Sequence, residues 1–324
     1  MPALSEPLWN KAFSHIYVEE EALGYPLAER ALSVLNSASV IPIKHYKDIF
    51  NRHSQDFNAQ KKSPKLILAV RRDKFLFPGA NVCERYGHDN FFYAPQMMNC
   101  LYDCEYCYLR GMLNSANVLV FVNTNDYFSA ALNAAPAYIS VSYSSDMLAL
   151  EPIFGLAGEW LAFASKNPAL TLEIRTKAGY FNARAYKPFA SPNIILAWTL
   201  SPEEDISRYE QRAPALANRL SAMKAAIDAG FNTRLCVDPV LISNGWETRI
   251  ENMARSAREI IDTERLYDIS VGGFRVSKTH YKRMVKKSPG SIIRTLPLAE
   301  NGGVISYGAL DEARVKAHVT RALS

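Results

Sequence analysis

Three of the five cysteines in this 324-residue chain lie within eight residues of one another. Cys100, Cys104 and Cys107 follow the spacing C-x3-C-x2-C, and thiolates are soft ligands that suit zinc or iron–sulfur centres. A structural zinc site usually takes four ligands in two separated pairs, but the chain has no second C-x2-C pair. His88 is available as a fourth ligand, although its spacing from the cysteines does not favour that role.

Three thiolates on one short loop can instead hold three irons of a [4Fe-4S] cluster and leave the fourth iron open. An open iron can be chelated by the amino and carboxylate groups of S-adenosyl-L-methionine, whose reductive cleavage yields a 5′-deoxyadenosyl radical. Tyr106 stands just before the last cysteine, and a regular α/β repeat begins directly after it. Both features favour this interpretation over three incidental or zinc-binding cysteines.

The composition is that of an ordinary soluble globular protein, with 48% hydrophobic and 21% charged residues. No window approaches the roughly 18–20 apolar residues that a membrane span needs. The first residues, MPALSEPLWNKAF, lack the basic start and apolar core of a secretory signal. We therefore expect a cytoplasmic protein, in which an odd number of cysteines favours metal or redox chemistry over disulfides. The net charge of +5 permits a polyanionic partner without requiring one.

The elements that must position the cysteine loop alternate between strand and helix. Ahead of the loop we expect strands at 15–19, 39–43 and 66–70, a helix from Pro26 to about Leu35, and a loop-like stretch from Phe75 to Asn99. After Cys107, apolar and β-branched runs predict six strands, at 118–122, 138–143, 170–176, 194–200, 233–238 and 268–274. Helical patterns lie between several of them, at 154–164, 216–229 and 247–261.

This alternation predicts an α/β fold with parallel strands and right-handed crossovers. Six strands fall short of a complete TIM barrel and fit a partial (β/α)6 TIM-type barrel, with a doubly wound sheet as the alternative. We expect a small N-terminal α/β extension at residues 1–90, the barrel core at 91–275, and a basic C-terminal segment at 276–324. In either architecture the chemistry should gather at the C-terminal ends of the strands.

The C-terminal segment and its approach carry concentrated positive charge. The basic residues are Arg275, Lys278, Lys282, Arg283, Lys286, Lys287 and Arg294. Several of them recur at three- and four-residue steps, so a one-sided stripe on a helix is expected, either as a solvated face or as a contact for a DNA backbone. Residues 300–308 read ENGGVISYG, and their Gly-Gly turn predicts a β-hairpin.

With these features the sequence resembles the radical S-adenosylmethionine enzymes, and more narrowly the spore photoproduct lyase family. CEYCYL at 104–109 is similar to the family's C-x-Y-C-Y-L block, and KSPKLILAVRR at 62–72 resembles the basic strand that precedes the cluster loop. SSD at 144–146 resembles the family's T-S-D, and RTK at 175–177 ends a strand as T-K does there. DPVLISNGWE at 238–247 resembles the A-P-I-x-x-x-x-G-W-E block.

The resemblance covers nearly the whole chain and implies a fold, a reaction and partners. The implied fold is a radical S-adenosylmethionine core, a partial (β/α)6 barrel with a C-terminal hairpin that helps to open DNA. The implied reaction is repair of 5-thyminyl-5,6-dihydrothymine, a methylene-bridged thymine dimer that ultraviolet light produces in DNA. The lesion must leave the base stack to reach a buried cofactor. The implied partners are DNA carrying this photolesion and an electron donor such as ferredoxin or flavodoxin.

The resemblance also assigns roles to single residues. Cys100, Cys104 and Cys107 are expected to ligate the cluster. Ser145, Asp146, Lys177 and Thr199 are expected to contact S-adenosylmethionine, although Ser144–Asp146 also suit a helix cap. Tyr106 and Tyr108 match two tyrosines of the family's hydrogen-transfer relay, or else pack around the loop. Tyr307, Gly302 and Gly303 fall where the family has its lesion-opening hairpin, and an apolar or aromatic wedge there would help to unstack a base.

One position departs from the family. The hydrogen-donating cysteine stands three residues before the Asp of T-S-D, and here that residue is Tyr143. Tyr143 can itself be the catalytic donor, or Cys83 or Cys236 can replace it, with a buried core cysteine as the commoner explanation of Cys236. Tyr143 can equally belong to a radical enzyme that acts on another substrate. A non-catalytic, zinc-containing DNA-binding protein is the alternative from a different class.

Overall fold

The computed structural model describes residues 13–80 and 82–324, and the chain divides into two compact units. Of the described residues, unit 1 comprises 13–79, 85–101 and 113–174, and unit 2 comprises 80, 82–84, 102–112 and 175–324. The predicted lack of a secretory signal concerns residues 1–12, which lie outside the described residues. No helix in the described ranges is long and apolar enough to cross a membrane. The expected three-part division at residues 90 and 275 stays a prediction.

Unit 1 contains a five-stranded sheet in the order β2-β1-β3-β8-β6. Its strands are β1 (His15–Glu19), β2 (Ser39–Ile43), β3 (Leu66–Ala69), β6 (Met97–Met98) and β8 (Val118–Phe121). The first four in that order are mutually parallel, and β6 runs antiparallel to β8. All side chains of β3 and β8 are buried, as expected of central parallel strands. The helical segments η1 (Glu20–Gly24), α2 (Pro26–Val34), α3 (Lys47–Phe50), α4 (Phe57–Lys62) and α6 (Thr124–Ala134) connect these strands or follow them.

Unit 1 also contains the strands that run from β4 through β5 and β9 to β10. They are β4 (Phe77–Pro78), β5 (Phe91–Tyr93), β9 (Ala137–Ser140) and β10 (Leu170–Thr176), whose last two residues belong to unit 2. Strands β5, β9 and β10 are parallel, whereas β4 is antiparallel to β5. The helical segments η2 (Leu148–Leu150), α7 (Glu151–Phe154) and α8 (Leu156–Ser165) connect β9 to β10.

These pairings correct two sequence-based expectations. The run at 118–122 does form a strand, but it pairs with the N-terminal strands and not with β9. The strand beside β9 is β5, which lies inside the stretch that we expected to be loop. Because β5 has three residues, it is too short to show the alternation or apolar run by which strands are recognised.

Unit 2 is built on the parallel strands β11 (Ile194–Thr199), β13 (Asn232–Val240) and β14 (Asp268–Gly273). The helical segments α9 (Ala183–Tyr186) and η3 (Lys187–Phe189) precede β11. Those between the three strands are α10 (Glu203–Tyr209), α11 (Leu216–Asp228), α12 (Trp246–Ile260) and η4 (Thr263–Arg265). All six side chains of β11 are buried. The cysteine loop contributes β7 (Asp103–Cys104), which pairs with β12 (Glu210–Gln211), and α5 (Leu109–Met112).

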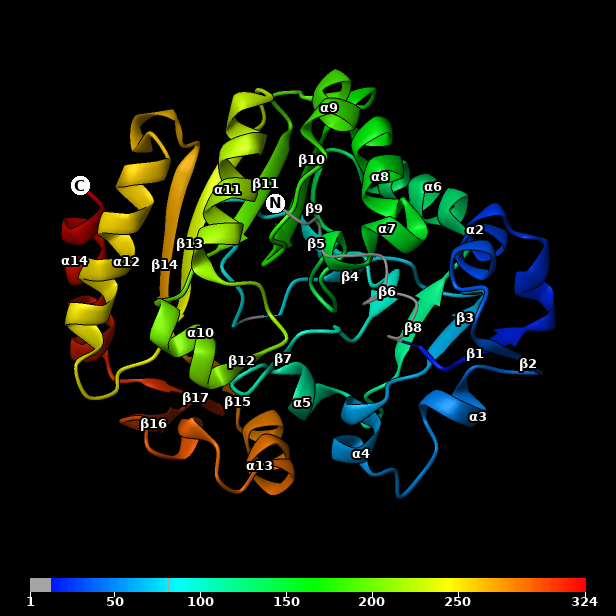
Figure 1. Ribbon diagram of the computed structural model, residues 1–324, viewed down its shortest axis with the longest axis horizontal. Coiled ribbons are helices and arrows are strands. Elements are labelled where there is room, and N and C mark those ends of the chain that lie inside the picture. Colours follow the sequence, from blue (N-terminus) through cyan, green and yellow to red (C-terminus); the bar gives the residue numbers. More distant parts are fainter. Residues whose placement is uncertain (1–12, 81) are drawn as a thin grey trace. The chain divides into compact units, whose positions relative to one another are not determined.

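The C-terminal part of unit 2 confirms the predicted hairpin. Strands β16 (Leu298–Asn301) and β17 (Val304–Tyr307) are antiparallel, and β17 also pairs with β15 (Arg275–Ser277). Gly302 and Gly303 form the turn with φ values of 56° and 79°, which glycine adopts without steric cost. Helix α13 (Lys278–Lys287) and η5 (Ile292–Arg294) separate β15 from β16, and α14 (Ala309–Leu323) lies beside α12 (Figure 1).

Candidate active site

The second half of the cysteine loop is fixed to unit 2 by backbone hydrogen bonds. Cys104 pairs with Glu210 in the ladder between β7 and β12, and the amide of Glu105 donates to the carbonyl of Tyr209 at 2.7 Å. The amide of Cys107 donates to the carbonyl of Cys104 at 3.2 Å, which closes a tight turn between the two thiols. Cys104 is buried and Cys107 is half-buried. The loop is therefore held by its backbone, so its side chains are placed by the fold.

The first cysteine is anchored separately, in unit 1. The carbonyl of Cys100 accepts a hydrogen bond of 2.9 Å from the Nζ of Lys61. The preceding residue, Asn99, has a φ of 68°, and its buried side-chain amide donates to the carbonyls of Ser115 and Asn117 at 2.8 and 2.7 Å. Asparagine tolerates this left-handed conformation better than most residues. The chain is thus bent sharply just before the cysteine motif.

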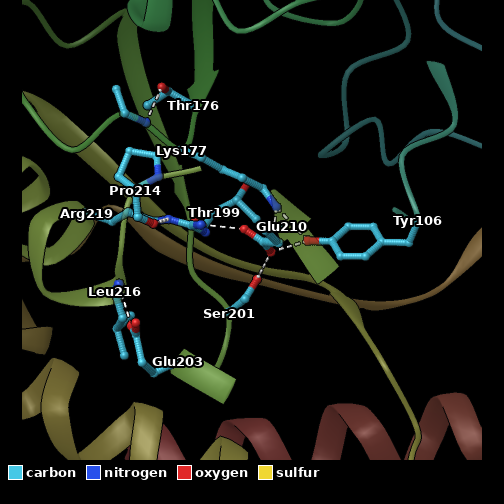
Figure 2. Close-up of polar contacts among 11 residues, drawn as sticks. Tyr106, Thr176, Lys177, Thr199, Ser201, Glu203, Glu210, Pro214, Leu216 and Arg219 are labelled. Atoms are coloured by element: carbon cyan, nitrogen blue, oxygen red, sulfur yellow. Dashed lines mark hydrogen bonds and ion pairs between the residues drawn. The ribbon is translucent and has the colours of Figure 1, made fainter. Parts of the chain in front are cut away.

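A buried carboxylate, Glu210, joins the cysteine loop to the strand ends of unit 2 (Figure 2). Its Oε1 accepts from the hydroxyl of Tyr106, from Lys177 Nζ at 2.8 Å and from Ser201 Oγ at 2.7 Å. Its Oε2 forms an ion pair with Arg219, a guanidinium that is fully buried. Both carboxylate oxygens are therefore satisfied, as a buried charge requires.

The charges around Glu210 set the protonation states in this network. Burial alone would raise the pKa of Glu210, but Lys177 and Arg219 together hold it well below its usual range. Burial, followed by the nearby Glu210 carboxylate, raises the pKa of Tyr106 well above that of an exposed tyrosine. Tyr106 is therefore a neutral phenol that donates to an anion. Lys177 Nζ also lies 2.6 Å from the Tyr106 hydroxyl and 4.9 Å from the centre of its ring.

Lys177 and Thr199, two of the residues expected to bind cofactor, both lie beside this network. Lys177 follows β10, and its side chain is 14% exposed. Thr199 ends β11 and is buried, and its carbonyl accepts from Arg219 at 3.2 Å. The remaining bond of Arg219 runs to the carbonyl of Pro214 at 2.8 Å. The structure thus brings Tyr106, Lys177 and Thr199 together through Glu210 and Arg219.

The SSD segment in unit 1 is buried, and its side chains contact backbone groups. Ser144 Oγ donates to the carbonyl of Met97 and Ser145 Oγ to that of Asn99, each at 2.7 Å. Asp146 accepts from the amide of Ala149, inside the 3-10 turn η2 that follows, at 3.0 Å. Both serines therefore hold the backbone that leads into the cysteine motif.

Tyr143, which we expect at the position of the family's hydrogen donor, belongs to a column of aromatic rings in unit 1. Its ring stacks on that of Tyr93 with centroids 4.4 Å apart, and Tyr93 stacks on Phe77 at 5.4 Å. Arg71 and Lys74 lie over the ring of Phe77 at 5.1 and 4.9 Å. Tyr93 thus stacks on two rings and Tyr143 on one, and these contacts favour one orientation of each ring. The ring of Tyr143 is consequently restrained by its contact with Tyr93.

The other two cysteines have different surroundings, both within unit 2. Cys83 is half-buried in a turn, where its amide donates to the carbonyl of Ala80 at 2.9 Å. The neighbouring carbonyl of Val82 accepts from Arg275 at 3.0 Å, and Arg275 is paired with Asp238. Cys236 is fully buried in the middle of β13, as the core interpretation expects. Tyr108 is half-buried and its carbonyl begins the hydrogen bonding of α5.

One functional expectation, for Tyr307, is modified by these contacts, and another, for the three cysteines, stays open. Tyr307 is buried, its hydroxyl donates to the carbonyl of Val240 at 3.2 Å, and it accepts from the amide of Ile242 at 2.9 Å. It therefore ties the hairpin to the end of β13 and is not an exposed wedge. Within the described residues, no group of three or more His, Cys, Asp or Glu side chains is arranged to hold a metal ion. The convergence of the three thiols on one cluster stays a prediction.

Glu210, Arg219 and Ser201 are the site residues that the sequence analysis missed. One signal for them was present. Arg219 stands on the buried face of α11, together with Leu216, Leu220 and Met223. A charged residue at an apolar position of a helical pattern predicts a buried partner of opposite charge.

The comparisons with known proteins confirm the family resemblance inferred from the sequence motifs. The family model for spore photoproduct lyase matches residues 12–296, most of the chain. The chain belongs to the spore photoproduct lyase family. No functionally curated protein matches it.

Solved structures of spore photoproduct lyase are similar to this family member over almost its whole length. A double mutant with bound AdoMet and dinucleoside spore photoproduct is 18% identical, with 97% of this chain and 96% of that chain covered and a TM-score of 0.81. Spore photoproduct lyase complexed with dinucleoside spore photoproduct is 17% identical, with the same coverage and a TM-score of 0.82. This likeness confirms the predicted fold class, an α/β fold with a partial (β/α)6 barrel.

Proposed function

We propose that this protein is a radical S-adenosylmethionine enzyme that repairs 5-thyminyl-5,6-dihydrothymine in DNA. The observation that carries the proposal is membership of the spore photoproduct lyase family in a chain that keeps all three cysteines of the C-x3-C-x2-C motif. When bound, the [4Fe-4S] cluster and S-adenosylmethionine would supply a 5′-deoxyadenosyl radical that abstracts a hydrogen atom from C6 of the lesion.

Cys100, Cys104 and Cys107 would hold the cluster, and their chemistry fits it. Thiolates are the usual ligands of iron–sulfur clusters, and the sequence has no second C-x2-C pair of the kind that completes a structural zinc site. Burial, which outweighs the nearby Lys177, raises the pKa of Cys104 to about 12. Such a thiol is a poor free nucleophile and becomes a thiolate when a metal ion binds it.

Ser145, Asp146, Lys177 and Thr199 would contact S-adenosylmethionine. An ammonium suits the carboxylate of the methionine end, and hydroxyl and carboxylate groups suit the ribose and the amino group. Lys177 is supported in this role by its partial exposure and by the Glu210 network that fixes its position. Ser145 and Asp146 are supported by their burial beside the backbone that leads into the cysteine motif.

Tyr143 would return a hydrogen atom to the thymine methylene radical, with Tyr106 and Tyr108 in the relay. An alkyl radical is more reactive than a phenoxyl radical, so donation from a phenol is favourable. The stack on Tyr93 supports this assignment because it restricts the ring of Tyr143. Cys83 is the alternative donor. Its thiol is half-buried, so it is partly accessible, and the adjacent carbonyl of Val82 accepts a hydrogen bond from Arg275 that restrains the turn.

The decisive experiment uses anaerobically purified, reduced protein with S-adenosylmethionine and a dinucleotide carrying the thymine photoproduct. We expect a brown protein with broad absorption near 400 nm, and release of thymine together with turnover of the cofactor. Ferredoxin or flavodoxin would be the physiological reductant, and a chemical reductant replaces it in the assay. Cys104→Ala should abolish cofactor cleavage, and retained cleavage would refute the ligand assignment.

Tyr143 favours a second candidate function, a radical enzyme of this family with another substrate. Formation of 5′-deoxyadenosine without release of thymine would support it against the first proposal. A colourless protein with one bound zinc ion would contradict both and leave the zinc-containing DNA-binding protein.

A further inference from the structure

The basic residues around α13 fall into two groups. The first group is bound inside unit 2. Arg275 pairs with Asp238 at 3.0 Å, Lys278 pairs with Glu300 at 2.7 Å, and Lys287 donates to the carbonyl of Arg110 at 2.8 Å. These three cationic side chains contact partners within the protein and connect the hairpin and α13 to their neighbours.

The second group consists of Lys282, Arg283, Lys286 and Arg294, all of which are exposed. Across residues 13–80 and 82–324, none of the four has a carboxylate within ion-pair distance. On α13, Lys286 stands four residues after Lys282 and three residues after Arg283, so the three side chains share one face. Burial and, to a smaller extent, the nearby positive charge of Arg283 lower the pKa of Lys287 to about 8. Positive charge is therefore crowded here, and a bound anion would relieve the repulsion.

Helix α13 is closely packed on the helix that follows the cysteines. Gly111 of α5 lies so near α13 that a Cβ there would collide with the carbonyl of His280. Further along, the guanidinium of Arg110 donates to Ser288 Oγ at 3.0 Å and to the carbonyl of Cys104 at 3.2 Å. Glu105, between two of the cysteines, accepts from the amide of Ile292. The basic face is thus carried by a helix whose position is fixed to the cysteine loop.

The hairpin is joined to the same helix at its other end. The amide of Lys278, the first residue of α13, donates to the carbonyl of Gly303 in the hairpin turn at 2.8 Å. Helix α13 directly follows β15, which pairs with β17 of the hairpin. The hairpin turn and the basic face therefore belong to one continuous piece of structure.

We propose that Lys282, Arg283 and Lys286 form a docking surface for the phosphate backbone of the nucleic acid that carries the lesion. This inference rests on the proposed function. It identifies the residues that contact the nucleic-acid backbone away from the bases that react. Exposed lysine and arginine side chains on one helix face are the usual contacts for phosphates, and each contact releases counterions.

A nucleic acid fits this surface better than an anionic membrane does. A helix that binds a membrane surface needs an apolar face to insert between lipids. In α13 the apolar side chain of Met284 is buried in the protein, and the hydroxyl of Tyr281 bonds to the carbonyl of Ile293. The exposed residues of α13 are Thr279, Lys282, Arg283 and Lys286, none of which is apolar, and Val285 is half-buried. The helix therefore lacks the exposed apolar face that insertion into a membrane needs.

The test compares two variants with the same loss of charge. In the first, Lys282, Arg283 and Lys286 are all replaced by glutamine. In the matched control, the exposed residues Arg184, Lys187 and Lys316 are replaced by glutamine, so that both variants lose three positive charges. Binding to an undamaged duplex is measured at several salt concentrations, and repair is measured on the dinucleoside photoproduct and on the same lesion in a duplex.

We expect the α13 variant to bind the duplex more weakly, with a slope of log affinity against log salt reduced by about 2–3. Repair in the duplex should fall in parallel, while the control variant should retain the slope and activity of the unchanged protein. Equal slopes for the two variants would overturn the proposal. So would a variant that binds duplex normally and loses binding to vesicles of anionic lipid.

The two proposals fail in different ways. If the unchanged protein does not repair the dinucleoside, the proposed function fails, whatever the duplex binding shows. If the dinucleoside is repaired by the unchanged protein and both variants, and duplex binding does not depend on α13, only the docking surface fails. A loss of dinucleoside repair in the α13 variant alone would also count against a role confined to the backbone.

Discussion

The buried pair of Glu210 and Arg219 predicts a large and strongly non-additive effect on stability. Both side chains are 0% exposed, and removing one member of a buried ion pair typically costs about 3–5 kcal/mol. For Glu210→Gln we expect a value near the lower limit, about 3 kcal/mol. The new amide can turn its oxygen toward Arg219, and the hydroxyls of Tyr106 and Ser201 can reverse to accept from its nitrogen. Lys177, which loses its acceptor, is 14% exposed and can turn toward water.

The partner substitution, Arg219→Met, should cost a similar amount, about 3 kcal/mol, because it removes one of the two cations that stabilise the Glu210 carboxylate. In the double variant neither buried charge of the pair remains. Lys177, at 14% exposure, is the residual charge of the network and can reach water. We therefore expect the double variant to lose about 2–3 kcal/mol less than the sum of the single variants.

The measurement is urea unfolding at neutral pH, with all variants in the same cluster state. A matched control exists on the same helix, where Lys224 and Asp228 form an exposed pair, 49% and 45% accessible. The cycle of Lys224→Met and Asp228→Asn should give a coupling of about 0.5 kcal/mol or less. Additive effects for Glu210 and Arg219, or a coupling no larger than that of the control, would refute the account of the network.

Three further predictions concern a helix contact, the donor and a pH effect. Gly111→Ala should loosen α5 from α13, because the new methyl group meets the carbonyl of His280, and should cost about 1–3 kcal/mol in unfolding free energy; an unchanged stability would contradict the close packing. If Tyr143 donates the hydrogen atom, Tyr143→Phe in an assay reduced with dithionite should divert product from thymine to a sulfinate, formed when the sulfur dioxide radical anion of dithionite combines with the methylene radical; an unchanged thymine yield would point to Cys83, Cys236 or another route. Burial, which outweighs the neighbouring Arg249, raises the pKa of Asp205 to about 6. A raised pKa means that the folded state binds the proton more tightly, so ionisation of Asp205 removes stability as the pH rises from about 4 through 6. Asp205→Asn should therefore gain stability relative to the unchanged protein over that interval, and a parallel pH dependence of the two proteins would disprove the assignment.

The sequence was informative wherever a pattern was long. The strands at 170–176, 194–199 and 268–273 match their predicted positions closely, because each is a run of apolar or β-branched residues between turn signals. Helix α12 begins at Trp246 and ends at Ile260, within one residue of the prediction. The Gly-Gly turn likewise located the hairpin, because few residues other than glycine adopt two successive positive φ values.

Short or non-local features could not be predicted in this way. Strand β5 has three residues, and its identity comes from pairing with β9, which is far away in the sequence. The partners of Tyr106 are similarly remote, since Glu210 lies 104 residues further along the chain. The spacing of the cysteines identified the motif, but the ladder that fixes it to β12 depends on the tertiary fold. Residue roles inherited from a family resemblance therefore need these contacts before they can be argued physically.

The close packing of α5 against α13 also has a thermodynamic consequence. The bonds from Arg110 and Glu105 to Ser288 and Ile292 make the cysteine loop and the basic helix parts of one cooperative segment. Any ligand that restrains α13 then lowers the entropy lost when the loop is ordered, and the reverse holds by the same factor. Loading of the cluster loop and binding of a polyanion should thus be reciprocally linked. If the proposed function holds, an occupied cluster site would raise the affinity for DNA, and bound DNA would raise the affinity for the cluster by the same factor.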